Sequence, residues 1–223
     1  MKKIILMIVG AMLLIGCSSM HISQLDAHTK RLPTNNKATI LLSKIIDLDK
    51  YNTLLLVPEG PFIKGQMSKI EYFKELVTPN ELKMKMIARG LGKTVPSTED
   101  TYIINEAAKF YKSFLWFRLH KHINLDGYYG QFILTNPKTF EDYFIADIKL
   151  PSTLKGTGDR KVWYPLFNAF IDYIEQNSKS WQEKIKNKDD KNNTEPRVLE
   201  LIKKKNKNNT SKNTVKNLFN TLK

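Results

Sequence analysis

The sequence predicts an α+β fold, a two-layer α/β sandwich with a mixed, largely antiparallel sheet, preceded by a signal peptide and followed by a disordered basic tail. Three observations lead to this prediction. Apolar runs rich in strand-forming residues open the domain, residues 113–150 alternate apolar and polar side chains between turn signals, and a broad apolar helical face closes the domain. Strands and helices in this order favour two packed layers.

Two strands are expected at the start of the domain. Residues 38–46 and 53–57 are apolar and rich in strand formers, and the turn residues between them separate the two runs. The second run is almost continuously apolar, which is typical of a strand that is covered on both faces.

Two helices should follow these strands. Thr78 can cap a helix, Pro79 suits the first helical position, and Glu81 can bond back to the cap. This helix is expected to end before Gly90, which suits the left-handed position beyond a helix end. A second start at Ser97 and Asp100 leads to a helix that reaches residue 111.

The remaining elements form a three-stranded antiparallel meander and a final helix. The expected strands are residues 113–122, 128–135 and 142–150, with turns at residues 124–127 and 136–139. After a polar loop, apolar side chains recur at helical spacing up to about Asn177, at Leu166, Phe167, Phe170, Ile171 and Ile174.

The N-terminus has the order of a secretory signal. Met1 is followed by two lysines, an uncharged run extends to Gly16, and the chain then becomes polar. The apolar run is shorter than the roughly 20 residues that a helix spanning a bilayer needs. Cys17 is the only cysteine in the chain, so it has no partner for an internal disulfide.

The residues Leu14-Ile15-Gly16-Cys17 resemble the lipobox of bacterial lipoproteins. The resemblance implies that residues 1–16 are removed and that Cys17 carries the lipid anchor. Ser18 stands where an aspartate favours retention in the inner membrane, so the resemblance implies the periplasmic face of the outer membrane. The alternative is an ordinary secretory signal with a chance cysteine.

The mature chain divides into three parts. Residues 17–37 are polar and predict a tether, residues 38–183 form the α/β domain, and residues 184–223 form the tail. A flexible linker of about 20 residues spans roughly 25 Å, which would let the domain stand off the membrane. The tail has 12 Lys and Arg against 4 Asp and Glu, with too few apolar side chains to offset the entropy of ordering.

The tail has two interpretations. Its apolar residues near the C-terminus have the spacing of an amphipathic helix, and its lysines could bind an anionic envelope surface, with Lys203, Lys204, Lys205 and Lys207 as the candidates. Alternatively, the lysines only keep the tail solvated. Nucleic acid also attracts such charge, but export and the lack of interleaved aromatic residues argue against that partner.

Few residues point to catalysis or metal binding. His120 and His122 share one face of a predicted strand and are metal-ligand candidates, but a site needs further ligands, such as Asp126 or His28. Acidic pairs at residues 47–49 and 141–142 lie beside turns, where carboxylates commonly cap backbone amides. No nucleophile elbow or phosphate-binding glycine loop occurs in the sequence, so no cofactor is predicted.

Residues 53–177 resemble the small α/β domains of periplasmic lipoproteins, through the order of elements and the segment at residues 136–141. No functional residue is transferred from that resemblance. The leading hypothesis is a non-enzymatic, lipid-anchored binding or assembly module that acts on another envelope component. Its competitors are an envelope hydrolase that uses His120 or His122 and a protein that works through its tail. A hydrolase needs both histidines and an acid in one pocket, whereas a binding module needs exposed apolar or basic patches.

Overall fold

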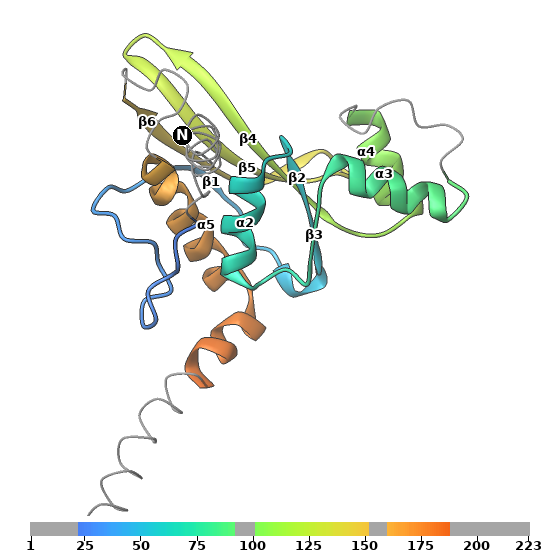
Figure 1. Cartoon of the computed structure of the whole chain (residues 1–223), viewed down its shortest axis with the longest axis horizontal. Helices are drawn as coiled ribbons and strands as arrows, with labels where there is room; N and C mark the ends of the chain where they lie inside the picture. Colours follow the sequence, from blue (N-terminus) through green and yellow to red (C-terminus); the bar gives the residue numbers. More distant parts are fainter. Residues whose placement is uncertain (1–21, 92–100, 152–159, 188–223) are drawn as a thin grey trace, which may run out of the picture.

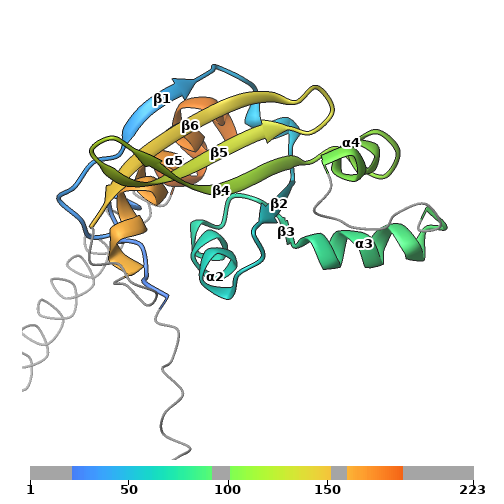
Figure 2. The same ribbon diagram turned by 90° about the horizontal axis from the view of Figure 1, so that it is seen from above.

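The computed structural model describes residues 22–91, 101–151 and 160–187, which build a six-stranded mixed sheet with helices against it (Figures 1 and 2). This confirms the predicted α+β class. In chain order the elements are β1 (Thr39–Ser43), the 3₁₀ turn η1 (Leu48–Lys50), β2 (Thr53–Val57), α2 (Pro61–Ile70), β3 (Glu75–Val77), α3 (Pro79–Ala88), α4 (Thr101–Phe110), β4 (Leu115–Asn124), β5 (Gly127–Asn136), β6 (Glu141–Leu150), the 3₁₀ turn η3 (Arg160–Trp163) and α5 (Tyr164–Asn177).

The sheet has the strand order β1-β6-β5-β4-β2-β3. The predicted meander is present, because the ten-residue strands β4, β5 and β6 pair antiparallel with one another in sequence order. Leu125 and Asp126 alone join β4 to β5, and Gly127 has φ 145°, a conformation that residues with a Cβ rarely adopt. β2 pairs parallel with both β3 and β4, and β1 pairs antiparallel with β6, so the sheet is mixed.

One face of the sheet, which we call the closed face, is covered by α2 and α5. Alternate strand residues such as Leu54, Phe117 and Phe132 point into its core and are fully buried. Phe170 of α5 packs against Phe117, with ring centroids 5.6 Å apart, and against Phe144, at 5.9 Å. Burial of each such side chain stabilises the fold by about 2 kcal/mol, so this aromatic layer fixes α5 on the sheet.

The opposite face is covered by α3 and α4 only near β2 and β3. Leu55 and Trp116, which alternate with closed-face residues, pack in a second cluster with α3 and α4. The predicted start of α3 is confirmed, because the Glu81 amide donates to Thr78 Oγ1 at 3.3 Å and Glu81 accepts from the Thr78 amide at 2.9 Å. Gly90 has φ 75°, as expected beyond the end of this helix.

Glu75 of β3 links the elements that cover the second face. Its carboxylate accepts hydrogen bonds from Lys112 at 2.5 Å and from Thr53 Oγ1 at 3.0 Å, and it also pairs with Lys85 of α3. Lys112, then Lys85, lower the pKa of Glu75 to about 2 against a small opposing effect of burial. The carboxylate therefore stays ionised while it joins α3 and the start of β4 to the sheet edge.

Two elements, α2 and β3, have no counterpart in the sequence prediction, which assigned nothing between residues 61 and 77. Gly60 caps α2 and Pro61 occupies its first turn, so a start signal was present. β3 has only three residues and is held by its pairing with β2. The second predicted helix is α4, although its predicted start at residues 97–100 lies outside the described ranges.

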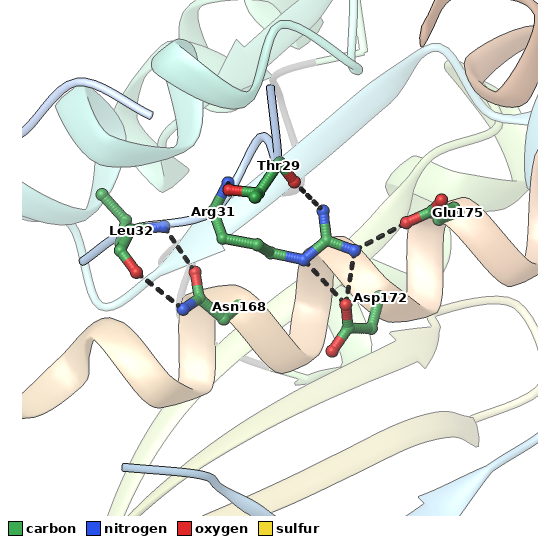
Figure 3. Close-up of polar contacts among 6 residues, drawn as sticks. All are labelled: Thr29, Arg31, Leu32, Asn168, Asp172 and Glu175. Carbon is green, nitrogen blue, oxygen red and sulfur yellow. Dashed lines mark hydrogen bonds and ion pairs between the residues drawn. The ribbon is translucent and has the colours of Figure 1, made fainter. Parts of the chain in front are cut away.

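Residues 22–37 correct the prediction of a tether over residues 17–37, because this part of the chain packs on α5 (Figure 3). Leu32 is 2% exposed, and its backbone amide and carbonyl both bond the side chain of Asn168, at 2.7 Å and 2.9 Å. Arg31 Nε donates to Asp172 at 2.8 Å, and its terminal nitrogen donates to Glu175 at 2.6 Å. The folded body therefore begins well before residue 38.

The chain also continues to pack beyond Asn177, where the sequence predicted that folding against the sheet ends. Residues 179–187 are helical, and Trp181 is 4% exposed within the closed-face core. Asp49 caps this helix by accepting from the Ser180 amide at 3.1 Å and from Ser178 Oγ at 2.6 Å. Burial opposes ionisation of Asp49, but the bonds from Ser178 and Ser180 outweigh it and lower its pKa to about 2.

Candidate functional site

The residues that the sequence predicted for lipid and surface attachment are not in the described ranges. Cys17, together with Lys203, Lys204, Lys205 and Lys207, lies outside them. Within those ranges, none of the helices combines the length and the apolarity that crossing a bilayer requires.

The part of the second face that α3 and α4 leave uncovered, over β4, β5 and β6, is called the open face. Strand alternation and register bring polar side chains together there, since His120 lies opposite Gln131 and His122 lies opposite Tyr129. Beside the apolar Ile133 and Ile145, the open face carries the polar residues Arg118, His120, His122, Tyr129, Gln131, Thr135, Asp142, Asp147 and Lys149. It is rich in groups that can donate or accept hydrogen bonds.

The two candidate histidines lie side by side on the open face, with ring centroids 6.0 Å apart. His122 stacks on Tyr129 at 5.4 Å, and its Nε2 is 3.4 Å from Oδ2 of Asp147. His120 is exposed to solvent. Asp147 is only 8% exposed, and its Oδ1 has no hydrogen-bond partner in the part of the chain that the structure describes. The arrangement thus contains one His–carboxylate pair with a spare acceptor.

The other candidate metal ligands, Asp126 and His28, either form other contacts or lie far from the two histidines. Asp126 accepts from Tyr129 Oη at 2.7 Å and from Lys149 Nζ at 3.1 Å, and these two contacts lower its pKa. His28 belongs to the segment that packs on α5, on the other side of the sheet. Among the described residues, no three His, Cys, Asp or Glu side chains come together as metal ligands.

Arg118 forms a second polar centre that the sequence prediction missed. Its guanidinium donates to Asp142 at 2.7 Å and to Thr135 Oγ1 at 2.8 Å, and it lies 4.7 Å from the ring centre of Trp116. Its Nε is buried and lacks a partner within the described ranges. Alternation along β4 already placed Arg118 in line with the histidines, but its partners Thr135 and Asp142 come from β5 and β6 and depend on the register of the sheet.

The acidic pairs of the sequence serve structural roles. Glu141 pairs with Lys44 at 2.8 Å while its neighbour Asp142 pairs with Arg118, so the two carboxylates have different partners. Asp47 caps η1 by accepting from the Asp49 amide at 3.2 Å. These contacts match the interpretation of the pairs as turn and capping residues.

The hairpin formed by β4 and β5 ends in an apolar surface, the hairpin tip, composed of Ile123, Leu125 and Tyr128. Leu125 is fully exposed, and Ile123 and Tyr128 are 70% and 55% exposed. The closed-face cover stops before this point, at Trp163, which fills the space above Gly130. Large apolar side chains that no helix covers mark a surface suited to contact with a partner.

A pocket of about 160 Å³ lies away from the histidines, between residues 24–30, the end of α2 and residues 179–187. Its lining includes Lys30, Lys69, Trp181 and Lys184 but neither histidine. The histidines thus lie on an open sheet surface rather than in this pocket.

No protein-family model, curated protein or solved structure matches the chain. The chemistry of the open face and of the hairpin tip is therefore the guide to its function.

Proposed function

We propose that the protein is a lipid-anchored lipoprotein of the bacterial cell envelope, at the periplasmic face of the outer membrane. Its α+β domain binds another envelope protein and does not catalyse a reaction. The lipobox-like residues Leu14-Ile15-Gly16-Cys17 support the anchor. Three acyl chains on Cys17 would give stable attachment, because one chain binds only marginally and two already hold a protein at a membrane.

The exposed hairpin tip is the observation that carries the binding role. Leu125 projects from a two-residue turn, so it can enter a partner's apolar pocket without rearrangement of the sheet. Ile123 and Tyr128 flank it, and the backbone pairing of β4 with β5 holds all three in place. A small cluster of large side chains on a rigid element is the usual energetic centre of a protein interface.

The open face lies on the other side of the hairpin from Ile123 and Tyr128, and it supplies polar contacts to a partner that also reaches around the tip. Tyr129 and Lys149 follow the hairpin tip along the sheet, and Asp147 offers the unpartnered Oδ1 beyond them. A partner that donates a hydrogen bond to this buried carboxylate would satisfy an atom that is otherwise desolvated. Apolar contact at the tip and a polar rim on the sheet fit the anatomy of a specific interface.

One observation favours a hydrolase as the second candidate. His122 beside Asp147 is a His–carboxylate pair of the kind that activates a nucleophile. Catalysis would also need a nucleophile or water within hydrogen-bond reach of His122. His122→Gln separates the two proposals, because it would abolish turnover in a hydrolase and leave crosslinking at the hairpin tip intact in a binding module.

The test is site-specific photo-crosslinking in intact envelopes. A photoreactive amino acid is placed at Leu125 and, as a matched control, at Met84, an apolar residue of α3 that is 64% exposed. We expect one discrete adduct at position 125 that disappears when Ile123→Asp is added, and no such adduct at position 84. Equal labelling at both positions would refute a hairpin interface. Mass spectrometry of the same protein reports whether Cys17 is acylated.

A further inference from the structure

The two ends of the described chain meet on one helix, α2. The side chain of Ile22 packs against Gly65, so closely that a Cβ on Gly65 would overlap it, and the side-chain Nε2 of Gln66 donates to the Ser23 carbonyl at 3.0 Å. Near the other end, Lys184 Nζ donates to the carbonyl of Glu71, the residue that caps α2, at 3.0 Å. Six residues of helix separate Gly65 from Glu71, which is about 9 Å.

The path from the anchor to the domain is short because the chain is held on α2 at Ile22 and Ser23 and on α5 at Arg31 and Leu32, the latter two shown in Figure 3. Only residues 18–21 stand between Cys17 and Ile22. Even fully extended, the five peptide steps from Cys17 to Ile22 span at most about 18 Å. An acylated Cys17 would therefore hold α2 close to the lipid, not at the end of a long tether.

The surface around these two chain ends, called the terminal face, consists of residues 22–30, α2 with residues 71–74, and residues 179–187. It carries seven lysines against three carboxylates. Lys30, Lys69 and Lys184 line the pocket of about 160 Å³ at its centre together with Asp26 and Glu71, and Lys184 pairs with Glu71. One of the carboxylates, Asp26, is occupied by the amides of His28 and Thr29, at 3.0 Å and 2.7 Å. The surface is thus positively charged beside the two points where the chain leaves it.

We propose that the terminal face lies against anionic phospholipid headgroups of the membrane that holds Cys17, an inference that rests on the proposed lipid anchor. Lysines near such a surface are attracted to it, so the three pocket lysines orient a domain that the acyl chains already retain. The chain beyond residue 187 leaves from this same face. Figure 1 shows the β4–β5 hairpin at the other end of the molecule from residues 179–187, so the hairpin tip points away from the lipid.

The test measures which part of the anchored protein touches the headgroups. Cys17 is the only native cysteine, so in the acylated protein an introduced cysteine is the only free thiol. A fluorophore is attached at Ser68→Cys, an exposed position of α2, or at Asn124→Cys in the hairpin. The full-length protein, purified with its acyl chains, is placed in vesicles that contain phosphatidylglycerol and a headgroup-linked quencher.

We expect strong quenching at position 68 and little at position 124. The charge-reversal variant Lys30→Glu, Lys69→Glu, Lys184→Glu should reduce quenching at position 68 to the level seen at 124. The matched control, Lys83→Glu, Lys109→Glu, Lys138→Glu, should keep the original signal. Vesicles of phosphatidylcholine alone should give the low signal for every variant.

Equal quenching at both positions, or a signal that survives reversal of the pocket lysines, would overturn the terminal face as the contact. Loss of the signal in a chain that ends at Asn187 would also overturn the proposal, because the tail, and not the terminal face, would then make the contact with the headgroups. Mass spectrometry separates these failures from failure of the anchor: an unmodified Cys17 thiol would refute the proposed lipoprotein itself.

Discussion

The closed face and the open face are built on the same three strands, yet they are stabilised in different ways. Phe117, Phe132 and Phe144 on the closed face meet an aromatic layer on α2 and α5. On the open face, Arg118 and Asp147 each retain a buried polar atom without a partner among the described residues. The closed-face cover also contains such atoms, Gln66 Oε1 and Trp181 Nε1, so the two faces differ in how far helices and aromatic rings cover them and not in whether unpaired polar atoms occur.

Phe170→Ala should have the largest effect on the closed face. Phe170 is fully buried and its ring contacts those of Phe73, Phe117 and Phe144. Its removal should lower the free energy of unfolding by about 4 kcal/mol, through lost burial and the cavity that remains. Urea unfolding followed by circular dichroism measures this loss. Phe110→Ala, at a 69% exposed position, should change it by less than about 0.5 kcal/mol.

Gly130→Ala tests the close approach of Trp163 to the closed face. A Cβ on Gly130 would lie 2.8 Å from Cη2 of Trp163, so the indole must move. We expect a loss of about 2 kcal/mol in urea unfolding. The same substitution in a Trp163→Ala background should cost less than about 0.5 kcal/mol. An equal loss in both backgrounds would mean that steric overlap is not the cause.

Glu75→Gln tests how much the ion pairs of Glu75 stabilise the part of the second face that α3 and α4 cover. The pKa of Glu75 is about 2 in the folded chain and about 4.3 when unfolded, so its stabilisation is complete above pH 4.3 and is lost as pH falls toward 2. The variant should lose about 2 kcal/mol at pH 7 and very little at pH 2. Urea unfolding at both pH values measures the difference. Glu183→Gln, at an exposed carboxylate, should change stability by less than about 0.5 kcal/mol at either pH.

Asp147→Val should raise the stability of the open face by about 1 kcal/mol. It removes a buried carboxylate oxygen that has no partner in the described ranges and introduces a residue that favours strands. Asp142→Val, on the same strand, should instead be destabilising because it leaves Arg118 without its carboxylate. Thermal unfolding compares the two. A loss of stability in both variants would contradict the contrast between these acids.

Leu125→Asp should have the smallest effect on folding and the largest on binding. Leu125 is fully exposed, so the free energy of unfolding should change by less than about 0.5 kcal/mol. The variant should nevertheless fail to compete for the partner that crosslinks at position 125. Undiminished competition by a stably folded variant would remove the hairpin tip from the interface.

Features encoded by neighbouring residues could be predicted from the sequence. The Thr78–Glu81 capping box and the turn at Gly127 depend on contacts within a few residues, and both are present. Burial of Leu32 and of Trp181 depends on α5 and on the closed-face core, which periodicity does not reveal. Asp147 lies beside His122 only because of the register in which β4, β5 and β6 pair. Predicting this contact therefore required the strand pairing, which the identities of the residues alone do not give.

The pairing of β1 with β6 links residues about a hundred positions apart in the chain, at Thr39 and Asp147. The entropy of closing so large a loop must be overcome before this edge of the sheet can form. β1 therefore has no native partner until the last strand is present, and α5 follows later still. The complete sheet can therefore form only after almost all of the domain has been synthesised.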